Sequence, residues 1–131
     1  MADSPTTRTM GELRKLGCIC AKVEHFNPYG GARINGKPVG IRQDLFGIVD
    51  ILVLDPERGF LGIQACSQSS ASHLRKMRED RTQECIDWLQ TPGGVLEVWC
   101  WRKVKLKRGG KAERWQPKVT ELTLNEFEVE R

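Results

Sequence analysis

Several features common in secreted, membrane and metal-stapled proteins are missing from this chain. No apolar run approaches the roughly 20 residues of a membrane-spanning helix, and the opening stretch MADSPTTRTM has no apolar segment of the kind found in secretory signals. The five cysteines are an odd number without a CxxC pair, so neither a disulfide framework nor a zinc site is indicated. We therefore expect a cytoplasmic protein in a reducing compartment that does not contact a membrane.

The size and composition predict one globular domain. The chain has 131 residues, of which 39% are hydrophobic and 29% are charged, which suits a single core. We therefore treat residues 1–131 as one domain. The glycine-rich stretch 27–43, NPYGGARINGKPVGIRQ, predicts a flexible loop or a β-ribbon turning at Asn35-Gly36. Residues 95–124 predict a basic C-terminal hairpin.

The hydrophobic pattern predicts an α/β fold with a central mixed sheet of about five strands and one helix on each side. Ser4 and Pro5 favour the start of a short helix over 5–16, and residues 18–26 are rich enough in β-formers for a strand. A long helix from Ser72 to about Gln90 then crosses over to the fourth strand. The first three strands are expected to form an antiparallel meander.

Two apolar strands, over about 46–54 and 60–66, form the centre of the predicted sheet and are joined by the turn 55–59. Each strand carries one polar residue, Asp50 in the first and Gln64 near the end of the second. A carboxylate in a buried strand is costly unless it is paired or binds a metal ion. The pattern therefore indicates a site, with turn capping by Asp50 as the alternative.

The spacing D-x13-Q-x-C from Asp50 through Gln64 to Cys66 resembles the motif of the PD-(D/E)XK superfamily of restriction-endonuclease-like nucleases. Within that superfamily, the chain is most similar to the Holliday-junction-resolvase-like branch of archaea and phages. The superfamily places an Asp on one strand, an acidic residue or Gln on the next strand, and a Lys two residues later. Cys66 stands where this Lys belongs. The resemblance covers about the whole chain, because the predicted order of helices and strands is the usual one for the superfamily.

The resemblance implies that Asp50 and Gln64 bind Mg²⁺ or Mn²⁺, with the backbone carbonyl of Ala65 as a further ligand. A Glu on the first helix often joins the metal site in the superfamily, which makes Glu12 a candidate; the alternative is an ordinary exposed Glu. Asp44 is another candidate, because strand alternation would place it on the same face as Asp50. The alternative for Asp44 is a turn-forming role.

The resemblance also suggests where a replacement for the missing Lys could lie. Some superfamily members are thought to supply the catalytic cation from the helix that follows the motif, so Lys76 and Arg75 are the candidates here. Either side chain could stabilise negative charge developing on a phosphate. The alternative is a basic helical turn that is simply solvated.

Positive charge is concentrated in residues 102–118, which hold eight basic residues against the single acidic Glu113. This segment has a net charge of +7, which leaves −3 for the rest of a chain whose net charge is +4. Such a field favours a polyanionic partner, although a solvated hairpin kept soluble by lysines has the same composition. We expect Trp99 in the core and Trp101 and Trp115 exposed, where they could stack on bases.

The candidate nucleic-acid contacts lie in the two glycine-containing segments. The basic residues of the loop favour a flap that touches nucleic acid over plain disorder. The full set of candidates is Arg33, Lys37, Arg42, Arg102, Lys103, Lys105, Lys107, Arg108 and Lys111.

These observations predict a Mg²⁺-dependent, resolvase-like endonuclease that cleaves phosphodiester bonds in branched or duplex DNA. A homodimer is expected, because resolvases cut two strands symmetrically. One alternative is a catalytically lapsed nuclease fold that binds DNA or regulates. Another is a structural protein whose basic ribbon meets an acidic partner.

Overall fold

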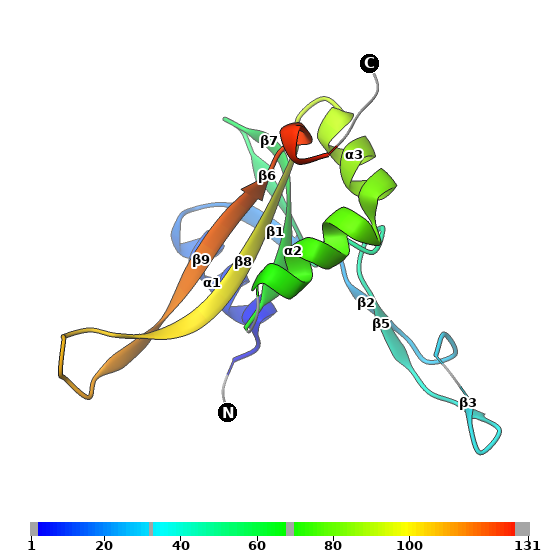
Figure 1. Ribbon diagram of the computed structural model, residues 1–131, viewed down its shortest axis with the longest axis horizontal. Coiled ribbons are helices and arrows are strands. Elements are labelled where there is room, and N and C mark those ends of the chain that lie inside the picture. The colour runs from blue at the N-terminus through cyan, green and yellow to red at the C-terminus, as the bar shows by residue number, and fades with distance from the viewer. Residues whose placement is uncertain (1–2, 32, 68–69, 128–131) are drawn as a thin grey trace.

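The computed structural model describes residues 3–31, 33–67 and 70–127, and its centre is a five-stranded mixed sheet (Figure 1). Strands β1, β6 and β7 form an antiparallel meander, β8 lies parallel to β7, and β9 is antiparallel to β8. Their bounds are β1 Ile19–Lys22, β6 Ile51–Asp55, β7 Gly59–Cys66, β8 Gly94–Lys105 and β9 Glu113–Leu122. The predicted α/β class and five-stranded mixed sheet are therefore confirmed.

Helices cover both faces of the sheet. Helix α1 (Pro5–Lys15) packs against β1, β7 and β8, and its N-cap Ser4 accepts a hydrogen bond from the N–H of Thr7, as the Ser-Pro start predicts. Helices α2 (Ser70–Glu79) and α3 (Thr82–Gln90) form the crossover that a parallel strand pair requires, and both contact β8. None of the helices among the described residues is long and apolar enough to cross a membrane.

The prediction of one long helix after the motif is wrong, because the helix is interrupted at Asp80 and Arg81. The hydroxyl of Thr82 donates hydrogen bonds to the carbonyls of Arg78 and Glu79 at this break. Asp and Thr are weak helix formers in mid-helix positions, since their short polar side chains compete for backbone hydrogen bonds. The sheet therefore has one helix on one face and two on the other.

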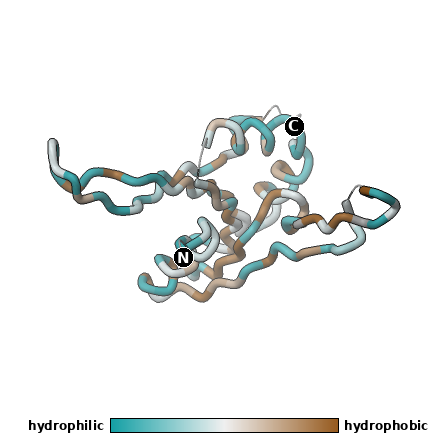
Figure 2. The backbone as a smooth tube through the Cα atoms, turned by 90° about the horizontal axis from the view of Figure 1, so that it is seen from below, coloured by the Kyte–Doolittle hydropathy of each residue, from teal (hydrophilic) through white to brown (hydrophobic). Residues whose placement is uncertain are grey.

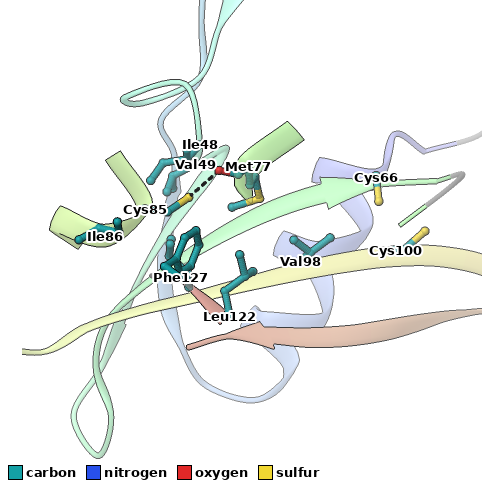
Figure 3. Close-up of a cluster of buried hydrophobic side chains, with 11 residues drawn as sticks. Ile48, Val49, Cys66, Met77, Cys85, Ile86, Val98, Cys100, Leu122 and Phe127 are labelled. Carbon is teal, nitrogen blue, oxygen red and sulfur yellow. Dashed lines mark hydrogen bonds between the residues drawn. The ribbon is translucent and has the colours of Figure 1, made fainter. Parts of the chain in front are cut away.

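Two hydrophobic clusters fill the space between the sheet and its helices. The cluster below α2 and α3 includes Val49, Met77, Cys85 and Val98 (Figure 3). The cluster below α1 contains Leu13, Ile51, Val53, Leu61, Ile63, Trp99 and Trp101. Successive residues of a strand face opposite ways, so the two clusters identify which side chains lie on each face of the sheet.

The tryptophans differ from the sequence prediction at two positions, Trp101 and Trp115, neither of which is exposed. Trp99 is buried, as expected, but Trp101 is buried as well, and its indole N–H donates to the hydroxyl of Thr9 at 2.8 Å. Helix α1 covers this part of the strand, which the alternating pattern of β8 does not reveal. Trp115 is half-buried, with the guanidinium of Arg8 4.1 Å from its ring centre.

Two narrow arms project from the core to opposite sides (Figures 1 and 2). One is the end of the β8–β9 hairpin beyond β7. The other is the glycine-rich segment, which forms two antiparallel pairs: β2 (His25–Asn27) with β5 (Ile41–Gln43), and β3 (Arg33–Ile34) with β4 (Lys37–Pro38). The predicted strand over 18–26 is therefore divided between β1 and β2. The expected turn at Asn35-Gly36 is present, with positive φ at both residues.

After β9 the chain forms the short 3-10 helix η1 (Leu124–Glu126), which packs beside α3.

Candidate functional site

The segment before β6 is a tight turn, so the first half of the predicted strand over 46–54 is wrong. Residues 44–48 form this turn, and β6 begins at Ile51. Two residues of the turn have positive φ, Phe46 at 56° and Gly47 at 75°. Positive φ is unusual for a residue with a large side chain, and it shows that the turn is held in place by its surroundings.

Asp50 lies directly after this turn, held between the two neighbouring strands. Its N–H donates to the carbonyl of Ile63 at 2.9 Å, and its carbonyl accepts from the N–H of Val23 at 2.8 Å. Its side chain is 3% exposed and points to the end of β7. There, Oδ2 accepts from the backbone N–H of Ala65 at 2.9 Å and from the amide of Gln64 at 3.2 Å.

The Asp50 carboxyl group has a strongly raised pKa. Burial is the largest cause, and a hydrogen bond with the Asp44 carboxyl group and the charges of Asp44 and Glu24 add to it, raising the pKa of Asp50 to about 8. The hydrogen bond from Ala65 acts in the opposite direction. At neutral pH and without a bound cation, the Asp50 carboxyl group therefore keeps its proton.

Three carboxyl groups meet at this point. One oxygen each from Glu24, Asp44 and Asp50 lies within 4.8 Å of the others. Glu24 follows β1, is half-buried, and pairs with Lys22 at 3.3 Å. Glu24 lies outside the D-x13-Q-x-C motif, but an antiparallel meander places the end of β1 beside the start of β6, so the predicted topology already indicated its position.

Gln64 and Cys66 lie on the same face of β7, two residues apart. Gln64 donates to Asp50, so the predicted pair is in direct contact. Cys66 is buried, and its register partner on β8 is Cys100 (Figure 3). Burial is the main cause that raises the pKa of the Cys66 thiol to about 12, followed by its interactions with Cys100 and then by the charge of Asp50. Cys66 is therefore neutral at physiological pH.

A hollow of about 370 Å³ adjoins the acidic group on the side of α2. The wall includes Asp44 together with three basic or titratable side chains, His25, Lys76 and Arg81. Arg81 approaches the turn closely, since a Cβ atom added at Gly47 would lie 2.7 Å from its Nε. Negative and positive groups therefore share one small hollow.

The structure separates the two predicted replacement cations. Lys76 lines the hollow, whereas Arg75 is exposed and does not line it. His73 lies one turn before Lys76, and burial lowers its pKa, with the positive charge of Lys76 adding to the decrease and the charge of Asp44 opposing it. His73 is therefore uncharged at neutral pH, which leaves Lys76 as the positively charged side chain that α2 contributes to the wall of the hollow.

Glu12 is not part of the acidic group. It precedes the buried Leu13 on α1, the helix that packs on the opposite face of the sheet from α2 and α3. The sequence-based assignment of Glu12 to the metal site gains no support from this position.

The basic candidates lie on the two arms. Arg33 and Lys37 are exposed on the β3–β4 pair, and Arg42 belongs to β5, although its side chain lies outside the described part of the structure. The exposed ribbon candidates are Arg102, Lys103, Lys105, Lys107, Arg108 and Lys111. Both arms therefore carry positive charge away from the core.

No protein-family model, curated protein or solved structure matches this chain.

Proposed function

We propose that the chain is a divalent-metal-dependent nuclease that acts on DNA. The observation that carries this proposal is the meeting of Glu24, Asp44 and Asp50 within 4.8 Å. Carboxylate oxygens are the ligands that Mg²⁺ and Mn²⁺ prefer. A dication would also replace the proton that burial and like charge keep on Asp50, so these residues fit such an ion.

The remaining residues have separate roles in this proposal. The bound ion would supply Lewis-acid chemistry, which polarises the phosphate and activates water. Gln64 orients the Asp50 carboxylate through its amide. Lys76 provides the positive charge that the neutral Cys66 cannot, and it stabilises charge on the phosphate from the wall of the hollow. The two basic arms hold the DNA backbone.

Metal binding can be tested separately from catalysis. Binding of Mn²⁺ is measured by electron paramagnetic resonance. We expect wild-type protein to bind the ion and Asp50→Asn to bind it at least about tenfold more weakly, which is the loss of affinity seen when the residues around a metal are disturbed. Asp55→Asn is the control, because Asp55 ends β6 and its carboxylate accepts hydrogen bonds from the backbone N–H groups of Glu57 and Arg58. Equal affinity in all three proteins would exclude this acidic group as the metal site.

The role of Lys76 can be tested by cleavage of duplex and branched DNA with Mg²⁺. Lys76→Ala should lose about a hundredfold in rate while DNA binding is retained, because it removes a charge partner of the transition state. Arg75→Ala is a matched control from the adjacent position of α2, since Arg75 does not line the hollow. A similar loss in both variants would assign these charges to DNA binding alone.

The second candidate function is a DNA-binding module descended from a nuclease. It is favoured by one observation, the buried and neutral Cys66 at the motif position of Lys. Wild-type protein that binds DNA without cleaving it, combined with activity gained in Cys66→Lys, would support this candidate over the enzyme.

A further inference from the structure

The β8–β9 ribbon has two faces with different neighbours. Gln64, Cys66 and Cys100 lie on the face covered by α2 and α3, because Cys66 and Cys100 belong to the cluster below these helices. Trp99 and Trp101 lie on the face covered by α1. Because alternate residues of a strand share a face, the same division continues along the ribbon beyond the end of β7.

Three arginine and lysine side chains continue the face of the candidate site. Arg102 follows Cys100 by two residues, and Lys118 is the register partner of Cys100, so Cys66, Cys100 and Lys118 form one row across β7, β8 and β9. Arg114 pairs with Val104 further along the same face. Arg102, Arg114 and Lys118 are exposed, and none of them forms an ion pair with a residue that the structure describes.

The cations on the other face have intramolecular neighbours. Lys103 is the register partner of Trp115, and its ammonium lies 5.4 Å from the centre of that ring. Arg8 of α1 contacts the same ring. Lys105 is paired in register with Glu113, the single acidic residue of residues 102–118. This face is therefore directed towards α1, and its charge is partly offset.

We propose that a nucleic-acid backbone runs along the ribbon face that bears Arg102, Arg114 and Lys118 and continues to the acidic group at Asp50, while the opposite face of the ribbon does not contact it. The inference rests on the proposed function only for the metal site at the Asp50 end of this track. The ribbon extends five residues beyond the row of Cys100, about 17 Å at the usual rise of a strand. Successive phosphates of one strand of a duplex are about 3.4 Å apart along the helix axis, so this length spans about five of them.

The decisive experiment compares equal charge removal from the two faces. Arg102→Gln with Lys118→Gln removes two positive charges from the proposed track, and Lys103→Gln with Lys105→Gln removes two from the opposite face of the same ribbon. Binding of a fluorescent duplex is measured against salt in EDTA, which excludes metal and cleavage. We expect the first variant to flatten the slope of log K against log salt by about two units and the second by less than one. Thermal melting confirms that both variants fold.

Several outcomes would overturn the inference. Equal loss of slope in the two variants would show that only the total charge of the ribbon matters. Loss confined to the Lys103 and Lys105 variant would place the nucleic acid on the other face. Tighter binding of wild-type protein to anionic phosphatidylserine vesicles than to DNA would identify a different partner. Because all measurements are made without metal, a face-specific loss stands even if the protein proves unable to cleave DNA.

Discussion

At Asp50, burial and two neighbouring carboxylates act in the same direction, since each disfavours the charged form of the side chain. Asp50 is nevertheless well bonded, with Ala65 and Gln64 as donors. A buried, hydrogen-bonded carboxyl group that is held protonated suits the proposed cation site, because a bound ion would take the place of the proton. Cys66 shows the contrasting case, because its raised pKa keeps a thiol neutral beside the same carboxyl group.

The raised pKa of Asp50 predicts how stability depends on pH. An unfolded Asp ionises near pH 4, whereas the folded Asp50 keeps its proton until about pH 8. The folded state binds more protons between these values, so this residue makes stability fall as the pH rises from about 4 to about 8. In EDTA, Asp50→Asn should be more stable than wild type at pH 8 by at least about 1.4 kcal/mol, the equivalent of one pKa unit, and should lose that advantage near pH 4.

Urea unfolding at both pH values measures this effect. Asp80→Asn is the control, because Asp80 is exposed at the break between α2 and α3. Mn²⁺ should reduce the stability advantage of Asp50→Asn over wild type at pH 8, because the ion stabilises the ionised carboxylate that only wild type has. An Asp50→Asn variant that is less stable than wild type at pH 8 would contradict the protonated state.

Among the elements, the turn of residues 44–48 positions the most important groups. It presents Asp44 to the hollow and leads directly into Asp50. The turn is braced by Arg81, whose guanidinium lies against Gly47 and pairs with Glu84 at 3.2 Å. The break between α2 and α3 is what places Arg81 there, so the helix interruption and the turn form one unit.

A pair of glycine substitutions tests this brace. Gly47 and Gly109 have similar φ angles, 75° and 78°, so Ala at either position incurs the same left-handed strain of about 1–2 kcal/mol. Only Gly47 has a neighbour in the way, Arg81, while the space at Gly109 is open to 4 Å. We expect Gly47→Ala to lower the free energy of unfolding slightly more than Gly109→Ala, as measured in urea, because the flexible Arg81 side chain must move aside.

Relief of the clash supplies the control for that comparison. Adding Arg81→Ala to Gly47→Ala should recover part of the difference, because the obstructing guanidinium is gone. If Gly47→Ala and Gly109→Ala lower the free energy of unfolding equally, and Arg81→Ala restores none of the loss, Arg81 does not brace the turn.

At the scale of the whole molecule, the two arms leave opposite sides of the core, with α2 between them (Figure 1). A long polyanion that reaches the acidic group could contact both arms at once. Under the proposed function, a chain with a modest net charge of +4 would thus concentrate its positive field on the two arms that hold the DNA.

If DNA contacts both arms at once, charge removal from the two arms should reduce the salt dependence of binding additively. Removing Lys107, Arg108 and Lys111 from the tip of the β8–β9 ribbon by Ala substitution should flatten the salt slope of DNA binding by about three units, and Arg33→Ala with Lys37→Ala by about two. The combined variant should lose about five, since each cation neutralises its own phosphate. If the combined variant has the same salt slope as the tip variant alone, the arm that carries Arg33 and Lys37 does not touch the DNA.

Local sequence patterns determined a large part of this fold. The Ser4-Pro5 start of α1, the Asn35-Gly36 turn and the strands of the final hairpin follow from caps, turn chemistry and alternation, which depend on neighbours only a few residues away. The contact of Asp50 with Gln64 was also predictable, because a short hairpin turn brings its two strands into register.

Tertiary packing decided the rest. Glu24 joins the acidic group only because β1 pairs with β6, and Lys76 reaches the hollow only because the crossover helices lie over that end of the sheet. Trp101 and Lys103 lie on the same face of β8, yet α1 covers Trp101 and leaves Lys103 exposed. A strand pattern reports which residues share a face, but the elements that pack against that face come from distant parts of the chain, and their docking alone determines what is buried there.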